Sequence, residues 1–144
     1  MKYLHTMIRV NNLDESIRFY TELLGMNLIS RTDYPDGKFT LAFLSYGQTK
    51  QDPCIELTYN YDKSSYQMGD AFGHIALGTA DIYQTCNRLK ESGATIVREP
   101  GPMKHGSTVI AFIFAREHQG ENFLVPKLKK GPDATGYTDY PFAE

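Results

Sequence analysis

The stretch HIALGTADIYQTCNRLKESG at residues 74–93 decides the fold, because it repeats the pattern of HTMIRVNNLDESIRFYTELLG at residues 5–25. Both stretches begin with a histidine in a short strand pattern and continue with apolar residues at helical spacing. Asn12 and Asp81 suit the N-caps of the two helices, and a glycine follows each helix where its C-terminal end is expected. The sequence therefore predicts two copies of one structural module.

Each copy continues with three further strand patterns. They cover residues 27–34, 39–47 and 54–60 in the first copy and residues 94–101, 107–114 and 121–128 in the second. The order of elements is βαβββ in both copies. The predicted fold class is α+β, with two paired βαβββ modules that form a curved mixed sheet with a metal-lined cleft.

The domain organisation follows from this repeat. We expect a single domain over residues 1–127, with module one at 1–60, a linker at 61–70 and module two at 71–127. Residues 128–144 are rich in glycine, proline and charge, which predicts an irregular C-terminal tail.

The composition is that of a soluble globular protein, with 144 residues, 41% hydrophobic and 22% charged, and a net charge of −2. This charge gives no electrostatic basis for binding nucleic acid or an anionic membrane. No apolar stretch approaches the roughly 20 residues that cross a bilayer. The two cysteines, Cys54 and Cys86, do not make a disulfide framework. We therefore expect a reduced, cytoplasmic protein with neither a nucleic-acid nor a membrane partner.

Three residues suggest a metal site. His5 and His74 occupy equivalent positions at the start of each module, and Glu56 interrupts the apolar strand that closes module one. Imidazole and carboxylate groups that converge in a cleft suit a divalent ion such as zinc, nickel, cobalt, manganese or iron. A single strand histidine is more often a structural residue, but two at equivalent positions favour ligation. Arg9 lies four positions after His5, so an alternating strand points both side chains to one face.

Four segments resemble the glyoxalase I (lactoylglutathione lyase) family of the vicinal-oxygen-chelate superfamily, namely LHTMIRV (4–10), FTLAFLSYG (39–47), IELTYN (55–60) and GHIAL (73–77). The resemblance covers residues 1–112. It implies a homodimer whose metal site lies at the subunit interface and is held by two histidines and two glutamates. Three of these ligands correspond to His5, Glu56 and His74. The compact chain resembles the bacterial-type enzymes, which prefer nickel or cobalt over zinc, so Ni²⁺ is expected ahead of Co²⁺, Zn²⁺ and Mn²⁺.

The resemblance also implies an activity. The family isomerises the methylglyoxal–glutathione hemithioacetal to S-lactoylglutathione, which detoxifies methylglyoxal. The metal acts as a Lewis acid while a carboxylate, for which Glu56 is one candidate, moves a proton from C1 to C2. Arg9 resembles the residue that pairs with the γ-glutamyl carboxylate, Asn60 resembles its amide partner, and Arg98 aligns with a basic residue at the glycyl end.

The C-terminal part departs from the family pattern. The family run D-P-D-G-x-x-I-E-L carries the fourth ligand and base, whereas this chain has REHQGENFLVPKL at residues 116–128. Glu121 is the nearest carboxylate to the expected position, and it becomes the candidate fourth ligand and catalytic base. A strand slip of one residue reverses the direction of a side chain, so Glu121 needs a bulge or a shifted register to reach the metal. Glu117 and His118 are weaker substitutes.

Two alternatives remain at this point. Without a fourth carboxylate, His5, Glu56 and His74 form a two-histidine, one-glutamate set, which suits a dioxygenase or a metal-dependent thiol transferase of the same fold. The chain could also be an inactive homologue that binds a metal or ligand without turnover. The segment IELTYN and Arg9 favour glutathione recognition over the first alternative.

Overall fold

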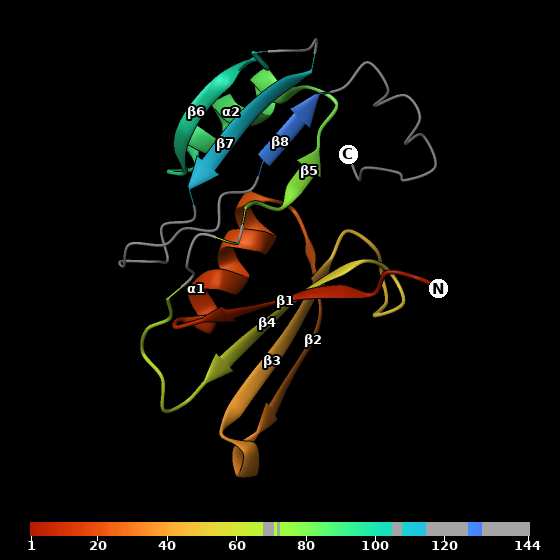
Figure 1. Ribbon diagram of the computed structural model, residues 1–144, viewed down its shortest axis with the longest axis vertical. Coiled ribbons are helices and arrows are strands. Elements are labelled where there is room, and N and C mark those ends of the chain that lie inside the picture. The colour runs from red at the N-terminus through yellow and green to blue at the C-terminus, as the bar shows by residue number, and fades with distance from the viewer. Residues whose placement is uncertain (68–70, 72, 105–107, 115–126, 131–144) are drawn as a thin grey trace. The chain divides into compact units, whose positions relative to one another are not determined.

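A computed structural model describes residues 1–67, 71, 73–104, 108–114 and 127–130 of the chain (Figure 1). The chain divides into two compact units, with the main division after Gln67. The α+β class and the repeated βαβββ order are both confirmed. Within the described ranges, no helix has the length and apolar character needed to cross a membrane.

The first unit holds a four-stranded sheet in the order β1-β4-β3-β2. Strand β1 (His5–Val10) runs parallel to β4, and the other neighbours are antiparallel. The remaining strands are β2 (Asn27–Tyr34), β3 (Phe39–Ser45) and β4 (Cys54–Asn60). A 3₁₀ turn, η2 (Pro35–Gly37), joins β2 to β3. The sheet thus places the first strand of the module directly beside its last.

The helix of the first unit is shorter than the sequence pattern predicts. Helix α1 (Leu13–Arg18) passes into a π-helical turn, η1 (Phe19–Leu23), instead of continuing as α-helix. The Thr21 hydroxyl donates to the Ile17 carbonyl at 2.8 Å. In a regular α-helix, this carbonyl accepts from the Thr21 backbone amide. The expected cap is confirmed, since the Asn12 side chain accepts from the Glu15 amide and donates to the Glu15 carboxylate.

The second unit repeats this arrangement with the sheet order β5-β8-β7-β6. Helix α2 (Ile82–Glu91) is capped by Asp81, as expected. The strands are β5 (Ala76–Gly78), β6 (Thr95–Pro102), β7 (Val109–Phe114) and β8 (Lys127–Lys130).

The first and the last strand of the second unit both differ from the prediction. The strand expected to start at His74 begins at Ala76. The last strand, expected at 121–128, is β8 at Lys127–Lys130, so residues 128–130 of the predicted tail belong to the sheet. Residues 121–126 lie outside the described part of the chain. Pairing with β5 and β7 defines β8, and this pairing is not visible in the local sequence pattern.

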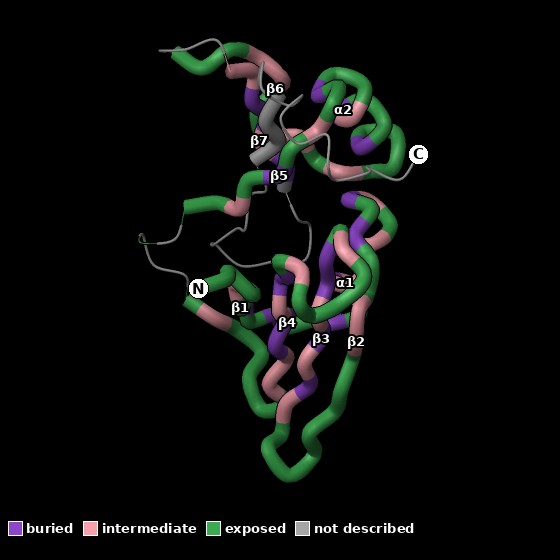
Figure 2. Tube along the Cα trace, turned by 90° about the vertical axis from the view of Figure 1, so that its right-hand side faces the viewer, coloured by how far each residue is buried: buried purple, intermediate pink, exposed green. Residues whose placement is uncertain are grey.

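The two faces of the first sheet are buried to different extents (Figure 2). Helix α1 packs on β3 and β4, and the residues on that face are buried, including Ile8, Val10, Ala42, Leu44 and Leu57. The opposite face alternates with it along each strand. There His5, Met7 and Arg9 are exposed, and their neighbours Phe43 and Glu56 are half-buried. This half-open face carries the candidate site.

Candidate active site

The side chains of His5 and Glu56 contact each other on the half-open face of the first sheet. In the parallel pairing of β1 with β4, His5 lies opposite Cys54 and Met7 lies opposite Glu56, so all four residues share a face. The His5 Nε2 atom lies 2.9 Å from Glu56 Oε2. The imidazole is 40% exposed and the carboxylate 14% exposed. The strands that open and close the first module are therefore neighbours, and they bring the two side chains together.

Three neighbours support this pair. The Thr58 hydroxyl donates to Glu56 Oε1 at 3.4 Å, which leaves Oε2 for His5. The Phe43 ring meets the His5 ring edge-on, with centroids 5.6 Å apart and planes at 85°. The Lys50 ammonium lies 4.4 Å from the centroid of the Phe43 ring. These contacts hold a nitrogen donor and an oxygen donor side by side within reach of solvent, which fits a divalent metal.

The histidine contact recurs in the second unit. The His74 ring lies edge-on to Phe112, with centroids 5.8 Å apart and planes at 79°. Phe112 follows His74 at the same sequence distance as Phe43 follows His5. Sequence reasoning identified the two histidines but missed both phenylalanines, although each lies at the same place in its repeated strand. The repeat therefore extends from the backbone to the surroundings of both candidate ligands.

The described residues supply a pair of candidate ligands and not a complete set. Within them, no three histidine, cysteine, aspartate or glutamate side chains gather as a metal site would require. His5 and Glu56 belong to the first unit, and His74 belongs to the second. Cys54, although opposite His5, is buried, and this burial raises the pKa of its thiol, which disfavours the thiolate that binds metals.

Lys127 occupies in the second sheet the position that Glu56 occupies in the first. In the parallel strand pairs, Glu56 lies opposite Met7 and Lys127 lies opposite Ala76. Met7 and Ala76 are both two positions after the histidine of their module. The pairing with the first strand of each module therefore makes Lys127 the counterpart of Glu56.

The antiparallel pairing agrees. Glu56 lies opposite Phe43 on β3, and Lys127 lies opposite Phe112 on β7. Both sets of backbone pairs therefore place Lys127 at the register position equivalent to Glu56. Glu121, the predicted fourth ligand and base, and the weaker candidates Glu117 and His118 lie outside the described residues.

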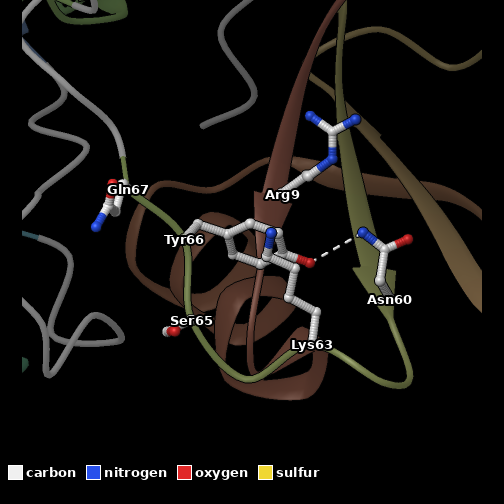
Figure 3. A pocket seen from close by; sticks show the side chains of 6 residues that line it. All are labelled: Arg9, Asn60, Lys63, Ser65, Tyr66 and Gln67. Carbon is white, nitrogen blue, oxygen red and sulfur yellow. Dashed lines mark hydrogen bonds between the residues drawn. The ribbon is translucent and has the colours of Figure 1, made fainter.

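A pocket of about 680 Å³ opens at the carboxyl ends of β1 and β4 (Figure 3). Sequence reasoning pointed to two of its lining residues, Arg9 and Asn60. Sequence reasoning missed the other four, which belong to the segment predicted to be a linker, and the only signal that could have found them is their closeness to Asn60 in the sequence. The lining consists of Arg9, Asn60, Lys63, Ser65, Tyr66 and Gln67.

Arg98 lies apart from this pocket in the chain. It belongs to β6 in the second unit, where it is exposed and donates to the Pro102 carbonyl at 3.1 Å. The nearby Lys90 and Glu99 form an exposed ion pair. The structure therefore brings Arg9 and Asn60 together within one unit and leaves Arg98 in the other.

Comparisons with known proteins bear on the family and the fold. The model of the Glyoxalase/Bleomycin resistance protein/Dioxygenase superfamily matches residues 2–124. A probable lactoylglutathione lyase of Synechocystis is 57% identical over 113 residues, which cover 78% of this chain and 86% of the relative. A lactoylglutathione lyase of Neisseria meningitidis is 47% identical over 137 residues, covering 95% and 98%. The crystal structure of glyoxalase I from Zea mays has a TM-score of 0.82 and 41% identity, and the match spans 90% of this chain but only 44% of the maize chain.

Proposed function

The chain belongs to the glyoxalase/bleomycin resistance protein/dioxygenase superfamily, and on this premise we propose that it is a lactoylglutathione lyase. The reaction is the isomerisation of the methylglyoxal–glutathione hemithioacetal to S-lactoylglutathione. The observation that carries the proposal is the His5–Glu56 pair on an open sheet face, in a chain 47–57% identical to relatives of that name. This activity detoxifies methylglyoxal.

The family implies a divalent metal, and we propose His5, Glu56 and His74 as its ligands. Imidazole nitrogen and carboxylate oxygen suit nickel, cobalt, zinc and manganese. Ni²⁺ is our first choice because the chain resembles bacterial lactoylglutathione lyases, and this resemblance implies a preference for nickel or cobalt over zinc. When bound, the metal polarises the substrate oxygens as a Lewis acid.

The protein's own groups then have two tasks. A carboxylate takes the proton from C1 of the hemithioacetal and returns it to C2, so it has to reach both carbons. Glu56 suits this task because Thr58 and His5 hold its two oxygens in a fixed orientation. Arg9 and Asn60 have the second task, which is to bind the γ-glutamyl end of the thiol, while Arg98 meets its glycyl end.

The test of this proposal is a reconstitution assay. The purified protein is stripped of metal, loaded with Ni²⁺, Co²⁺, Zn²⁺ or Mn²⁺, and supplied with methylglyoxal and glutathione. Formation of the thioester, followed by its ultraviolet absorbance, is the expected result, with the highest rate for Ni²⁺. A protein that retains these metals but forms no thioester is an inactive homologue, and oxygen uptake with catechols would instead identify a dioxygenase. The register that puts Lys127 at the position equivalent to Glu56 is the observation behind both alternatives, because without Glu121 the proposed ligands are His5, Glu56 and His74 alone.

Replacing Arg9 by alanine should raise the KM for the glutathione adduct and leave the metal content unchanged. No described carboxylate forms an ion pair with Arg9, so its guanidinium is available to a ligand carboxylate. Loss of a hydrogen bond to a charged group predicts a rise of roughly 10–100-fold. Arg31→Ala is the matched control, because Arg31 is an exposed arginine already paired with Asp14. An unchanged KM in the Arg9 variant would remove Arg9 from the site.

We also propose Glu121 as the fourth metal ligand and as the alternative base to Glu56, and replacing Glu121 by glutamine tests this assignment. If Glu121 serves as base, turnover should fall by about 10²–10⁴-fold. Lys127→Glu, which restores a carboxylate at the register position of Glu56, should then bring no gain in metal affinity, because the fourth place is already filled. Calorimetric titration with Ni²⁺ measures this affinity, and Lys130→Glu adds the same charge at another register position. Full activity of the Glu121 variant together with tighter metal binding by the Lys127 variant would contradict the assignment.

We also propose a homodimer in the cytoplasm, with each site shared between two subunits. Mixing His5→Ala with His74→Ala protein tests the sharing. In a mixed dimer, one site combines both substitutions, and the other combines an intact His5 with an intact His74. After subunit exchange, the expected activity is about one quarter of wild type, since half of the dimers are mixed and each has one intact site. No recovery would mean that each site is built within one chain.

A further inference from the structure

Met7 lies between the two ends of the proposed site. On β1 it is two positions after His5 and two positions before Arg9, and the alternation of a strand points all three side chains to the half-open face. Across the parallel strand pair, Met7 lies opposite Glu56. The Met7 thioether therefore has His5 and Arg9 on either side along its own strand and Glu56 beside it on the next strand.

A ligand that joins Arg9 to the His5–Glu56 pair has to cross Met7. The Cα atoms of His5 and Arg9 are about 13 Å apart, at roughly 3.3 Å per residue of strand. Met7 lies midway between them on the same face. In the proposed function, on which this inference rests, the γ-glutamyl end of the thiol binds near Arg9 and the reacting carbons lie near the metal. The Met7 side chain then faces the middle of the bound compound.

Met7 is also accessible to small molecules in solution. Its exposed fraction is 39%, the same as that of Met103, which follows β6 in the second unit. By contrast, Met26 is only 7% exposed, and the thiols of Cys54 and Cys86 are both buried. A small oxidant therefore reaches the Met7 sulfur more readily than either thiol.

We propose that Met7 is an oxidation site through which a hydroperoxide weakens ligand binding. A lone pair of the thioether sulfur attacks one peroxide oxygen, the O–O bond breaks, and an S–O bond forms. The sulfur gives up an electron pair and the peroxide is reduced. The second oxygen leaves with the proton of the transferred oxygen, as water from hydrogen peroxide or as an alcohol from an organic hydroperoxide.

Oxidation changes the surface that the ligand meets at this point. The thioether is apolar and flexible, whereas the sulfoxide is polar. Its oxygen carries partial negative charge on the residue opposite the Glu56 carboxylate, and it has no hydrogen to donate there. We therefore expect the sulfoxide at Met7 to lower ligand affinity. Met103 belongs to the second unit and is not among the residues proposed to bind metal or ligand, so its oxidation should have no such effect.

The experiment treats three proteins with dilute hydrogen peroxide and then removes the peroxide by desalting. The proteins are wild type, Met7→Leu and the matched control Met103→Leu, because leucine keeps an apolar side chain of similar volume without the sulfur. Peptide mass spectrometry measures the sulfoxide at each methionine. Calorimetry with S-methylglutathione measures ligand affinity, and each protein is compared with its own untreated sample.

Met7 and Met103 should be oxidised at similar rates in the wild type, while Met26 is spared. The affinity of wild type and of Met103→Leu should fall several-fold in step with the Met7 sulfoxide, whereas peroxide should leave the affinity of Met7→Leu unchanged. Methionine sulfoxide reductases should restore the lost affinity, because they reverse this modification. If Met7→Leu itself binds too weakly to measure, the time course in Met103→Leu and the reversal by the reductases decide.

Several results would overturn the inference. They are a Met7 that stays unoxidised after Met103 has reacted, full oxidation of Met7 with unchanged affinity, and an equal loss of affinity in Met7→Leu. Calorimetry needs no turnover, so the proposed function is tested separately. Affinity that follows the Met7 sulfoxide in a protein that forms no thioester supports the inference and contradicts the proposed reaction. An untreated wild type that does not bind S-methylglutathione contradicts both.

Discussion

Replacing His5 by alanine is expected to remove the bound metal and the lyase activity together. His5 supplies the nitrogen donor of the pair, and its Nε2 lies 2.9 Å from Glu56. Loss of a residue that only hydrogen-bonds a metal ligand lowers metal affinity roughly 10–100-fold. Loss of His5, a proposed ligand itself, should lower the affinity by more than this. The measurement is metal content by mass spectrometry after dialysis, alongside turnover. The fold should persist, because the histidine is 40% exposed and the substitution removes only its contacts with Glu56 and Phe43.

Two controls make this result specific. His105→Ala removes an imidazole that has no proposed role and should retain both metal and activity. The thermal unfolding midpoint of His5→Ala, measured without metal, should stay close to that of the metal-free wild type. If His5→Ala keeps a full complement of metal, the ligand assignment is wrong.

Replacing Glu56 by glutamine should abolish most turnover while preserving the shape of the site. Glutamine can still accept a hydrogen bond from Thr58, but it has no negative charge for the metal and cannot take a proton. Loss of a proton-transferring group lowers the rate about 10²–10⁴-fold. Loss of the negative charge should also weaken metal binding. Assays at saturating Ni²⁺ separate these effects, because excess metal restores occupancy but not proton transfer.

Glu91→Gln is the control for this substitution. Glu91 is an exposed glutamate at the end of α2, so its loss should leave the rate within the error of the assay. Glu56→Asp gives a second comparison, since it keeps the charge and shortens the reach. Near wild-type turnover of Glu56→Gln at saturating metal would exclude Glu56 from proton transfer and leave it only a ligand role.

Local sequence signals predicted much of the first sheet. The bounds of β2 and β4 agree with their patterns, because alternating residues and the Pro-Asp-Gly turn are local features. The π-helical turn was not predicted, since helical periodicity does not distinguish it from an α-helix over so short a stretch. No local pattern predicted the pairing of β1 with β4, because the two strands are far apart in the sequence.

The rest of the candidate site depends on contacts that sequence patterns do not encode. Tyr66 lies in a polar segment whose composition predicts a linker, and its place in the pocket lining depends on how the chain turns after Asn60. The position of Lys127 follows from strand pairing, whereas the apolar run near residue 124 suggested an earlier strand. Register is a property of the whole sheet, which is why the fourth position could not be located by counting residues.

The parallel pairing of β1 with β4 has a consequence for the order in which the protein assembles. His5 is made early during synthesis, but its partner Glu56 lies on the strand that completes the module. The pair cannot form until that whole stretch of chain has closed into a loop, which is a slow, non-local step. Metal capture by this pair should therefore report a finished module, and a nascent chain that stops before Cys54 should bind no metal through His5 alone.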